Sequence, residues 1–117
     1  FNSGHTRVGS VTGDVITLGA DTDFIAGEMR HTAIAAVDTD KYVMALWKIP
    51  DNRGWAWAAT AAGLAPTVGI PKQFSLGAPL EIEIGKLDTN KFVIVYNDFD
   101  VHDIYGIVGT TIGSTNI

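Results

Sequence analysis

The chain has 117 residues, of which 46% are hydrophobic, and its 8 basic and 13 acidic residues give a formal charge of −5. This length allows a single domain with a sizeable core. The acidic balance argues against nucleic acid as a partner, because a protein that binds the phosphate backbone needs a basic face. The absence of cysteine excludes disulfides and thiolate metal sites, and no run reaches the roughly 18 apolar residues of a membrane span.

Short runs of β-branched and aromatic residues follow one another along the chain, separated by Gly, Asp and Asn. Such runs, about 8–12 residues apart, are typical of all-β proteins. The Ala-rich stretch 56–65 does not indicate a helix, since the matching stretch 106–115 carries Gly, Val, Ile and Thr. We therefore expect strands at 7–11, 15–18, 32–37, 41–47, 55–61, 64–68, 81–87, 91–96 and 105–112.

The sequence repeats itself at an offset of fifty residues. The block 37–46 (VDTDKYVMAL) aligns without a gap with 87–96 (LDTNKFVIVY), and residues 14–67 match residues 64–117 at 11 of 54 positions. Internal repeats of about this length are typical of propellers, solenoids and arrays. The chain therefore contains about two and a third copies of one unit.

Each of the two blocks contains a tight turn. The segment 38–41 and its copy 88–91 begin with an Asp, whose carboxylate can accept a hydrogen bond from the backbone N–H two residues further on. The third residue, Asp40 or Asn90, tolerates a left-handed conformation. Both segments are therefore predicted to join two antiparallel strands as hairpins.

These patterns predict an all-β fold of four-stranded antiparallel units resembling β-propeller blades, with a β-sandwich or another repeat sheet array as the alternative. Residues 1–27 would form a partial unit with the third and fourth strands, and 28–77 a full unit. Residues 78–117 would form a partial unit with the first three strands and the start of the fourth. The strand 41–47 is apolar on both faces, which indicates a position between two neighbouring sheets.

The incomplete units at both ends predict a segment of a longer repeat protein, because a propeller needs about four units to close. The sequence begins at Phe1 without an initiator Met or a leader, which also favours a fragment or a processed product. The alternative is a small repeat protein whose open edges are covered by partners. The expected partners are thus the rest of a longer chain or copies of the protein itself.

The block 87–96, followed by Val108-Gly109-Thr110, resembles the repeats of poorly characterised bacterial and phage-encoded β-propeller-like surface proteins. The resemblance covers nearly all of the chain and rests on the pattern of turns and strands. It implies an exported or virion-exposed repeat protein, located outside the cell or on the virion surface. It transfers no catalytic residue.

Three tryptophans form a candidate ligand site. Trp47, Trp55 and Trp57 flank a loop that carries Asn52 and Arg53. Trp47 and Trp55 are predicted to pair across this hairpin, and exposed indoles beside polar groups can bind sugar rings. Cross-strand packing between units, worth up to about 1 kcal/mol per pair, is the preferred interpretation.

The loop 97–103 is a candidate metal site, because Asp98, Asp100 and Asp103 alternate with other residues as in loops that bind Ca²⁺. However, no Gly permits the sharp turn of the usual calcium loops and no later Glu completes the ligand set. A solvated turn is therefore the preferred interpretation, and no cofactor is expected.

The chain contains no nucleophile motif, phosphate-binding Gly loop or His pair at metal spacing, so it is not expected to be an enzyme. We predict a non-catalytic structural or binding repeat module, which can include self-assembly. A carbohydrate-binding module built on the tryptophan hairpin is the alternative. A third hypothesis is a fragment of a propeller hydrolase whose active residues lie in other units.

Overall fold

The computed structural model describes residues 3–113 and 115–117. These residues form antiparallel sheets, none closed into a barrel, and contain no α-helix, which confirms the all-β prediction. A short 3₁₀ helix, η1, spans Ile49–Asp51. The strands are β1 (Ser3–Thr6), β2 (Gly9–Thr12), β3 (Val15–Leu18), β4 (Thr22–Ala26), β5 (Met29–Asp38), β6 (Lys41–Lys48), β7 (Arg53–Thr60), β8 (Thr67–Val68), β9 (Lys72–Gln73), β10 (Pro79–Asp88), β11 (Lys91–Asp98) and β12 (Asp103–Thr110).

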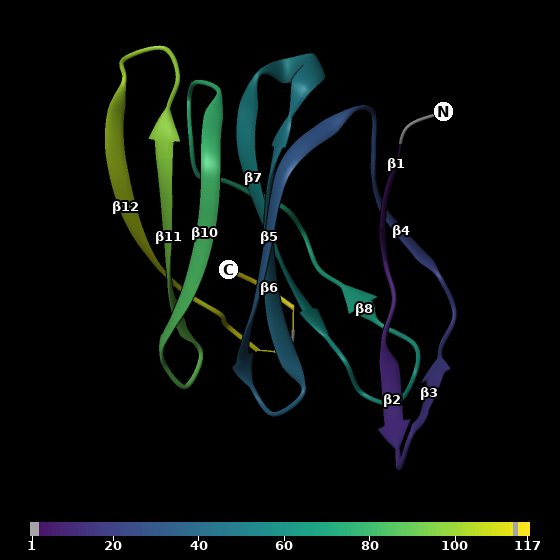
Figure 1. Cartoon of the computed structure of the whole chain (residues 1–117). Coiled ribbons are helices and arrows are strands. Elements are labelled where there is room, and N and C mark those ends of the chain that lie inside the picture. Colours follow the sequence, from purple (N-terminus) through teal and green to yellow (C-terminus); the bar gives the residue numbers. More distant parts are fainter. Residues whose placement is uncertain (1–2, 114) are drawn as a thin grey trace.

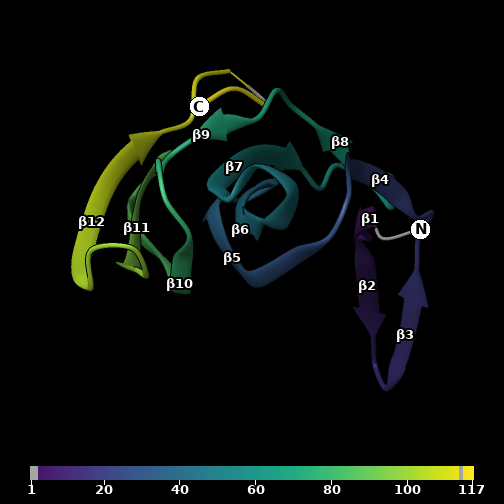
Figure 2. The same cartoon turned by 90° about the horizontal axis from the view of Figure 1, so that it is seen from above.

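The sheets follow one another in chain order, as Figure 1 shows. The central sheet has the order β5-β6-β7-β8, and β9 also pairs with β7. The C-terminal sheet has the order β10-β11-β12, and β10 packs against β5 and β6. At the N-terminal end, β1 pairs with β4 and β2 pairs with β3; seen from above, the β2–β3 hairpin projects away from the other strands (Figure 2).

The strand pairing repeats at the offset of fifty residues. Ile34 lies opposite Met44 in the central sheet, and Ile84 lies opposite Ile94 in the C-terminal sheet. The pairing of β6 with β7 returns in β11 with β12, and that of β1 with β4 returns in β7 with β9. The sequence repeat is therefore also a repeat of hydrogen-bonding register.

Some strands differ from the prediction. The run expected at 7–11 corresponds to β2, which begins only at Gly9, and β1, which ends at Thr6, was not predicted. The expected fourth strand, 64–68, is reduced to the two residues of β8, and the two-residue β9 follows it. β4 was not predicted. β8 and β9 lie at the edge of the central sheet, where each pairs only with β7.

The strand β6 is buried on both faces, as its apolar pattern predicts. Val43 and Ala45 belong to a first core cluster between the central and C-terminal sheets. Tyr42, Met44 and Leu46 belong to a second core cluster on the opposite face. The first cluster contains Val37, Val43, Ala45, Ala56, Ile82, Phe92, Ile94 and Tyr96, and the second contains Tyr42, Met44, Leu46, Trp57 and Ala59.

The tight turns after β5 and β10 form as predicted. However, each Asp carboxylate accepts a hydrogen bond from the N–H of the next residue and not from the N–H two residues further on. The backbone N–H of Thr39 donates to Asp38 Oδ1 over 2.9 Å, and that of Thr89 donates to Asp88 Oδ1 over 2.7 Å. Asn90 adopts the expected left-handed conformation, with a φ of 61°, whereas Asp40 does not. Each Asp therefore stabilises its turn through the residue that follows it directly.

The side chain of Tyr96 is buried at the base of the C-terminal hairpin. Its ring stacks on Tyr105 at 5.6 Å and meets Phe74 edge to face at 5.2 Å between ring centres. Burial raises the pKa of Tyr96 above its ordinary value, and the negative charges of Asp98 and of ionised Tyr105 raise it further. The folded chain therefore holds this phenol in its neutral form.

Ionisation of Tyr96 is expected to weaken the fold at high pH. Because its pKa is higher in the folded than in the unfolded chain, stability is unaffected below about pH 10 and falls as the pH rises from there through the folded pKa. The measurement is the urea midpoint at about pH 8 and about pH 11. Tyr96→Phe should reduce the alkaline decrease, whereas Tyr105→Phe, at an exposed position, should retain most of it. An undiminished decrease in Tyr96→Phe would contradict this assignment.

Candidate functional site

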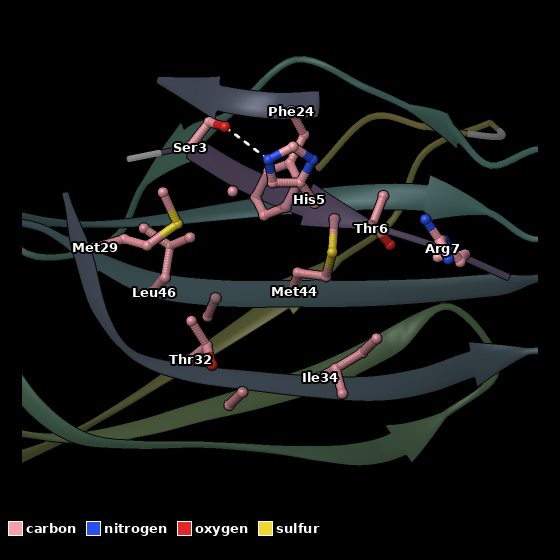
Figure 3. Close-up of a pocket in the computed structure, with 13 residues that line it drawn as sticks. Ser3, His5, Thr6, Arg7, Phe24, Met29, Thr32, Ile34, Met44 and Leu46 are labelled. Carbon is pink, nitrogen blue, oxygen red and sulfur yellow. Dashed lines mark hydrogen bonds between the residues drawn. The ribbon is translucent and has the colours of Figure 1, made fainter. Parts of the chain in front are cut away.

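A pocket of about 390 Å³ lies between β1 and the face that β5 and β6 turn away from the C-terminal sheet (Figure 3). Its β1 side carries polar side chains, and its opposite side is largely apolar. We call it the N-terminal pocket. The residues that line it are Ser3, Gly4, His5, Thr6, Arg7, Phe24, Met29, Thr32, Ala33, Ile34, Met44, Ala45 and Leu46.

His5 lies at the polar side of this pocket and is held by its neighbours. Its Nε2 is 2.7 Å from Ser3 Oγ (Figure 3), and its Nδ1 is 2.8 Å from Asp21 Oδ2 and 2.6 Å from Asp23 Oδ1. Arg7 Nε lies 3.8 Å from Asp21. Because these side chains are substantially exposed, such ion pairs contribute no more than about 1 kcal/mol.

His5, Asp21 and Asp23 also form the one His/Asp/Glu group with metal-ligand spacing in the part of the chain that the structure describes. The sequence did not indicate this group, because it arises from the pairing of β1 with β4, which places His5 opposite Asp23. Both ring nitrogens of His5 already have partners within the group and Ser3. These contacts account for the arrangement without a metal.

The tryptophans of the candidate sugar site do not lie on one surface. Trp47 lies opposite Gly54 and packs on the first core cluster, whereas Trp55 lies opposite Leu46 and packs on the second. The predicted pairing of Trp47 with Trp55 across the hairpin is therefore wrong. A shift of one residue along a strand moves a side chain to the other face, and the register separates the two indoles in this way.

Trp57 is part of the core. Its side chain is only 2% exposed, and its ring meets Phe24 edge to face with ring centres 5.2 Å apart. Trp47 is half-buried and stacks on His31 at 5.8 Å. Cross-strand and inter-sheet packing, the preferred interpretation of these indoles, accounts for Trp57 fully.

Trp55 retains the polar surroundings expected of the hairpin. Its Nε1 donates to Asp51 Oδ2 over 3.2 Å, and Lys48 Nζ lies 6.0 Å from its ring centre. Arg53 is exposed and donates to Gln73 Oε1 over 3.2 Å. The neighbouring Asn52 is exposed in a left-handed conformation. The hairpin therefore carries one half-buried indole with polar neighbours.

The carboxylates of the candidate metal loop take part in hairpin geometry. Asp98 lies opposite Asp103 across the ladder, and its Oδ1 accepts from the backbone N–H of Asp100 over 2.9 Å. The carbonyl of Asp98 accepts from the N–H of His102, which adopts a left-handed conformation with a φ of 60°. These hydrogen bonds are those of a turn, which is the interpretation that the sequence favoured.

A second cavity, of about 360 Å³, lies between the central and C-terminal sheets. Its lining includes Ile107 and Gly109 of β12 beside Phe74. Fifty residues earlier, the larger Trp57 and Ala59 occupy the positions of Ile107 and Gly109. This cavity therefore lies where the two copies differ in side-chain volume.

The outer face of the C-terminal sheet exposes apolar side chains. We call it the C-terminal face, and it contains Val93, Val95, Ile104 and Val108 of β11 and β12. Val108 is 65% exposed, whereas Ala58, its counterpart fifty residues earlier, is 0% exposed. Ala58 lies opposite Val43, which belongs to the first core cluster, so this position is on the covered face of the central sheet.

The N-terminal pocket shows the same contrast at the other end of the array. Ile34 is 64% exposed in the pocket, while its counterpart Ile84 packs against the first core cluster. Each end of the described array thus exposes apolar side chains at positions that are covered in the middle.

No family model, curated protein or solved structure matches the chain. Among the described residues no helix is long and apolar enough to cross a membrane.

Proposed function

We propose that the chain is a non-catalytic structural repeat module, built of β-propeller-like units, that docks onto further units through its exposed apolar ends. The observation that carries the proposal is the difference between Val108, which is exposed, and Ala58, which is buried at the matching position. Positions that one unit buries against the next are thus open at the end of the array. Contiguous exposed apolar surface of this kind marks an interaction site.

The contact between the central and C-terminal sheets indicates how a further unit would be held. Besides the apolar first core cluster, the backbone N–H of Asn90 donates to the carbonyl of Val37 over 3.1 Å. Lys41 Nζ donates to Asn90 Oδ1 over 2.9 Å. Lys91, the counterpart of Lys41, is exposed beside the C-terminal face and is available for the same hydrogen bond with another unit.

An exported or virion-surface protein is the setting that we propose for this module. The support is the resemblance of the block 87–96 to repeats of bacterial and phage-encoded surface proteins, together with the lack of catalytic motifs. Carbohydrate binding at Trp55 and its polar neighbours is the second candidate. It is favoured by the half-buried indole and the exposed side chains of Asn52 and Arg53 on the same hairpin.

Val108→Glu tests docking through the C-terminal face. We expect the unchanged chain to self-associate at micromolar concentration, because two copies can cover their C-terminal faces mutually. The substitution places a charge in the interface and should shift the mass measured by light scattering to that of the monomer. Thermal unfolding monitored by circular dichroism at low protein concentration should change little, because the side chain is exposed.

The matched control is Val101→Glu, which adds the same charge at an exposed valine outside the C-terminal face. It should self-associate as the unchanged chain does. A monomeric unchanged chain, or an equal effect of the two substitutions, would count against docking through the C-terminal face.

A further inference from the structure

The strand β1 has a free edge. Within the described residues, β1 forms a two-stranded sheet with β4 alone. Its counterpart in the central unit, β7, has partners on both edges: β8 and β9 on one, β6 on the other. β1 pairs with β4 in the same register as β7 pairs with β9, so β4 is the counterpart of β9. The other edge of β1, which is free, therefore corresponds to the edge of β7 that pairs with β6.

The lining of the N-terminal pocket indicates the same missing neighbour. Four lining residues have counterparts fifty residues later that belong to the first core cluster or pack against it. There, Val43 and Ala45 of β6 contribute to the packing that covers those counterparts. In the pocket, Thr32 and Ile34 are exposed, whereas Met44 and Leu46 are already buried in the second core cluster. The four pairs are Thr32 with Ile82, Ile34 with Ile84, Met44 with Ile94, and Leu46 with Tyr96.

We propose that the N-terminal pocket binds an antiparallel β-strand of the β6 type, which pairs with the free edge of β1 and directs small apolar side chains at the exposed Ile34. The free edge and the apolar lining are separate observations, and both assign this position to the same element. The inference rests on the proposed function, because it assumes that the missing strand follows the repeat. It specifies the partner at the N-terminal end of the array.

Strand addition gives each part of the site a defined role. Main-chain hydrogen bonds to β1 supply affinity, and the pocket selects the side chains on one face of the strand. In β6 the residues on that face are Val43 and Ala45, and in β11 they are Val93 and Val95. The partner is therefore an extended segment with Val or Ala at alternate positions, such as the second strand of another unit.

The binding test uses a fluorescent peptide with the sequence of β11, KFVIVYND, extended by lysines for solubility. We expect saturable binding to the full chain in fluorescence anisotropy. Ile34→Glu should weaken binding at least about tenfold, because it places a charge where the strand packs. The side chain is 64% exposed, so the variant is expected to fold, and circular dichroism provides that check.

Two N-methylated peptides separate strand pairing from apolar adsorption. Methyl groups on alternate amides block hydrogen bonding along one edge of a strand, and shifting them by one residue blocks the other edge. Only the peptide blocked on the edge that faces β1 should lose binding. Equal behaviour of the two peptides, or binding to Ile34→Glu as tight as to the unchanged chain, would overturn strand addition at this pocket.

Val108→Glu distinguishes this inference from the proposed function. It alters the opposite end of the array, so it should abolish self-association and leave peptide binding unchanged. Ile34→Glu should lose peptide binding and retain the association that depends on the C-terminal face. Peptide binding without self-association would support the pocket and reject the C-terminal face, and the reverse pattern would do the opposite.

Discussion

Trp57→Ala is expected to lower the free energy of unfolding by about 3–5 kcal/mol, the usual cost of truncating a buried Trp to Ala. The indole is 2% exposed and belongs to the second core cluster, where its ring meets Phe24 edge to face. The surrounding sheets can close only part of the cavity that the substitution leaves. Urea unfolding followed by far-ultraviolet circular dichroism measures the change.

Trp55→Ala is the matched control on the same strand. Trp55 is half-buried at the end of the hairpin, so the loss should be clearly smaller than for Trp57→Ala. Glycan-array binding separates the two roles that the sequence offered for the indoles. If Trp57→Ala left stability unchanged and removed binding to a sugar, Trp57 would belong to a ligand site and not to the core.

Phe92→Ala is expected to cost a similar amount, about 3–5 kcal/mol. The ring is 2% exposed in the first core cluster, which joins the C-terminal sheet to the central sheet. It also lies directly over Gly109, where a Cβ would overlap it. The substitution removes apolar contact on both sides, and the urea midpoint should fall accordingly.

Phe99→Ala provides the comparison for Phe92. Phe99 is 56% exposed on the hairpin after β11, so its removal should change stability by no more than about 0.5 kcal/mol. Comparable losses for the two phenylalanines would show that the first core cluster does not hold the sheets together.

The central strands were predictable because their signals are local. The alternation of apolar residues and the Asp-initiated turns indicated β6 and β11, and the offset of fifty residues aligned their registers. The bulges in β5 and β10 were not predictable. They require positive φ angles of 49° at His31 and 50° at Glu81. His is enriched at positive φ but still adopts it uncommonly, and Glu does not signal it.

The candidate sites depended on strand register and on pairing between distant strands, which the sequence specifies only in part. The sequence correctly placed Trp47 and Trp55 on one hairpin. It did not show that Trp47 lies opposite Gly54 and not opposite Trp55, a register that puts the two indoles on opposite faces. The contacts of His5 with Asp21 and Asp23 arise from pairing between β1 and β4, two strands that the sequence did not clearly indicate. Local composition does not specify such non-local pairs.

The sequence by itself determined the all-β character, the length of the unit and the two-sided burial of β6, because these depend on period-two patterns and turn residues within one segment. Only the tertiary structure decided which apolar faces are covered. Ala58 and Val108 occupy the same place in their units and both are apolar, yet one is buried and the other exposed. Burial depends on whether a neighbouring sheet is present, which is a property of the array and not of the unit.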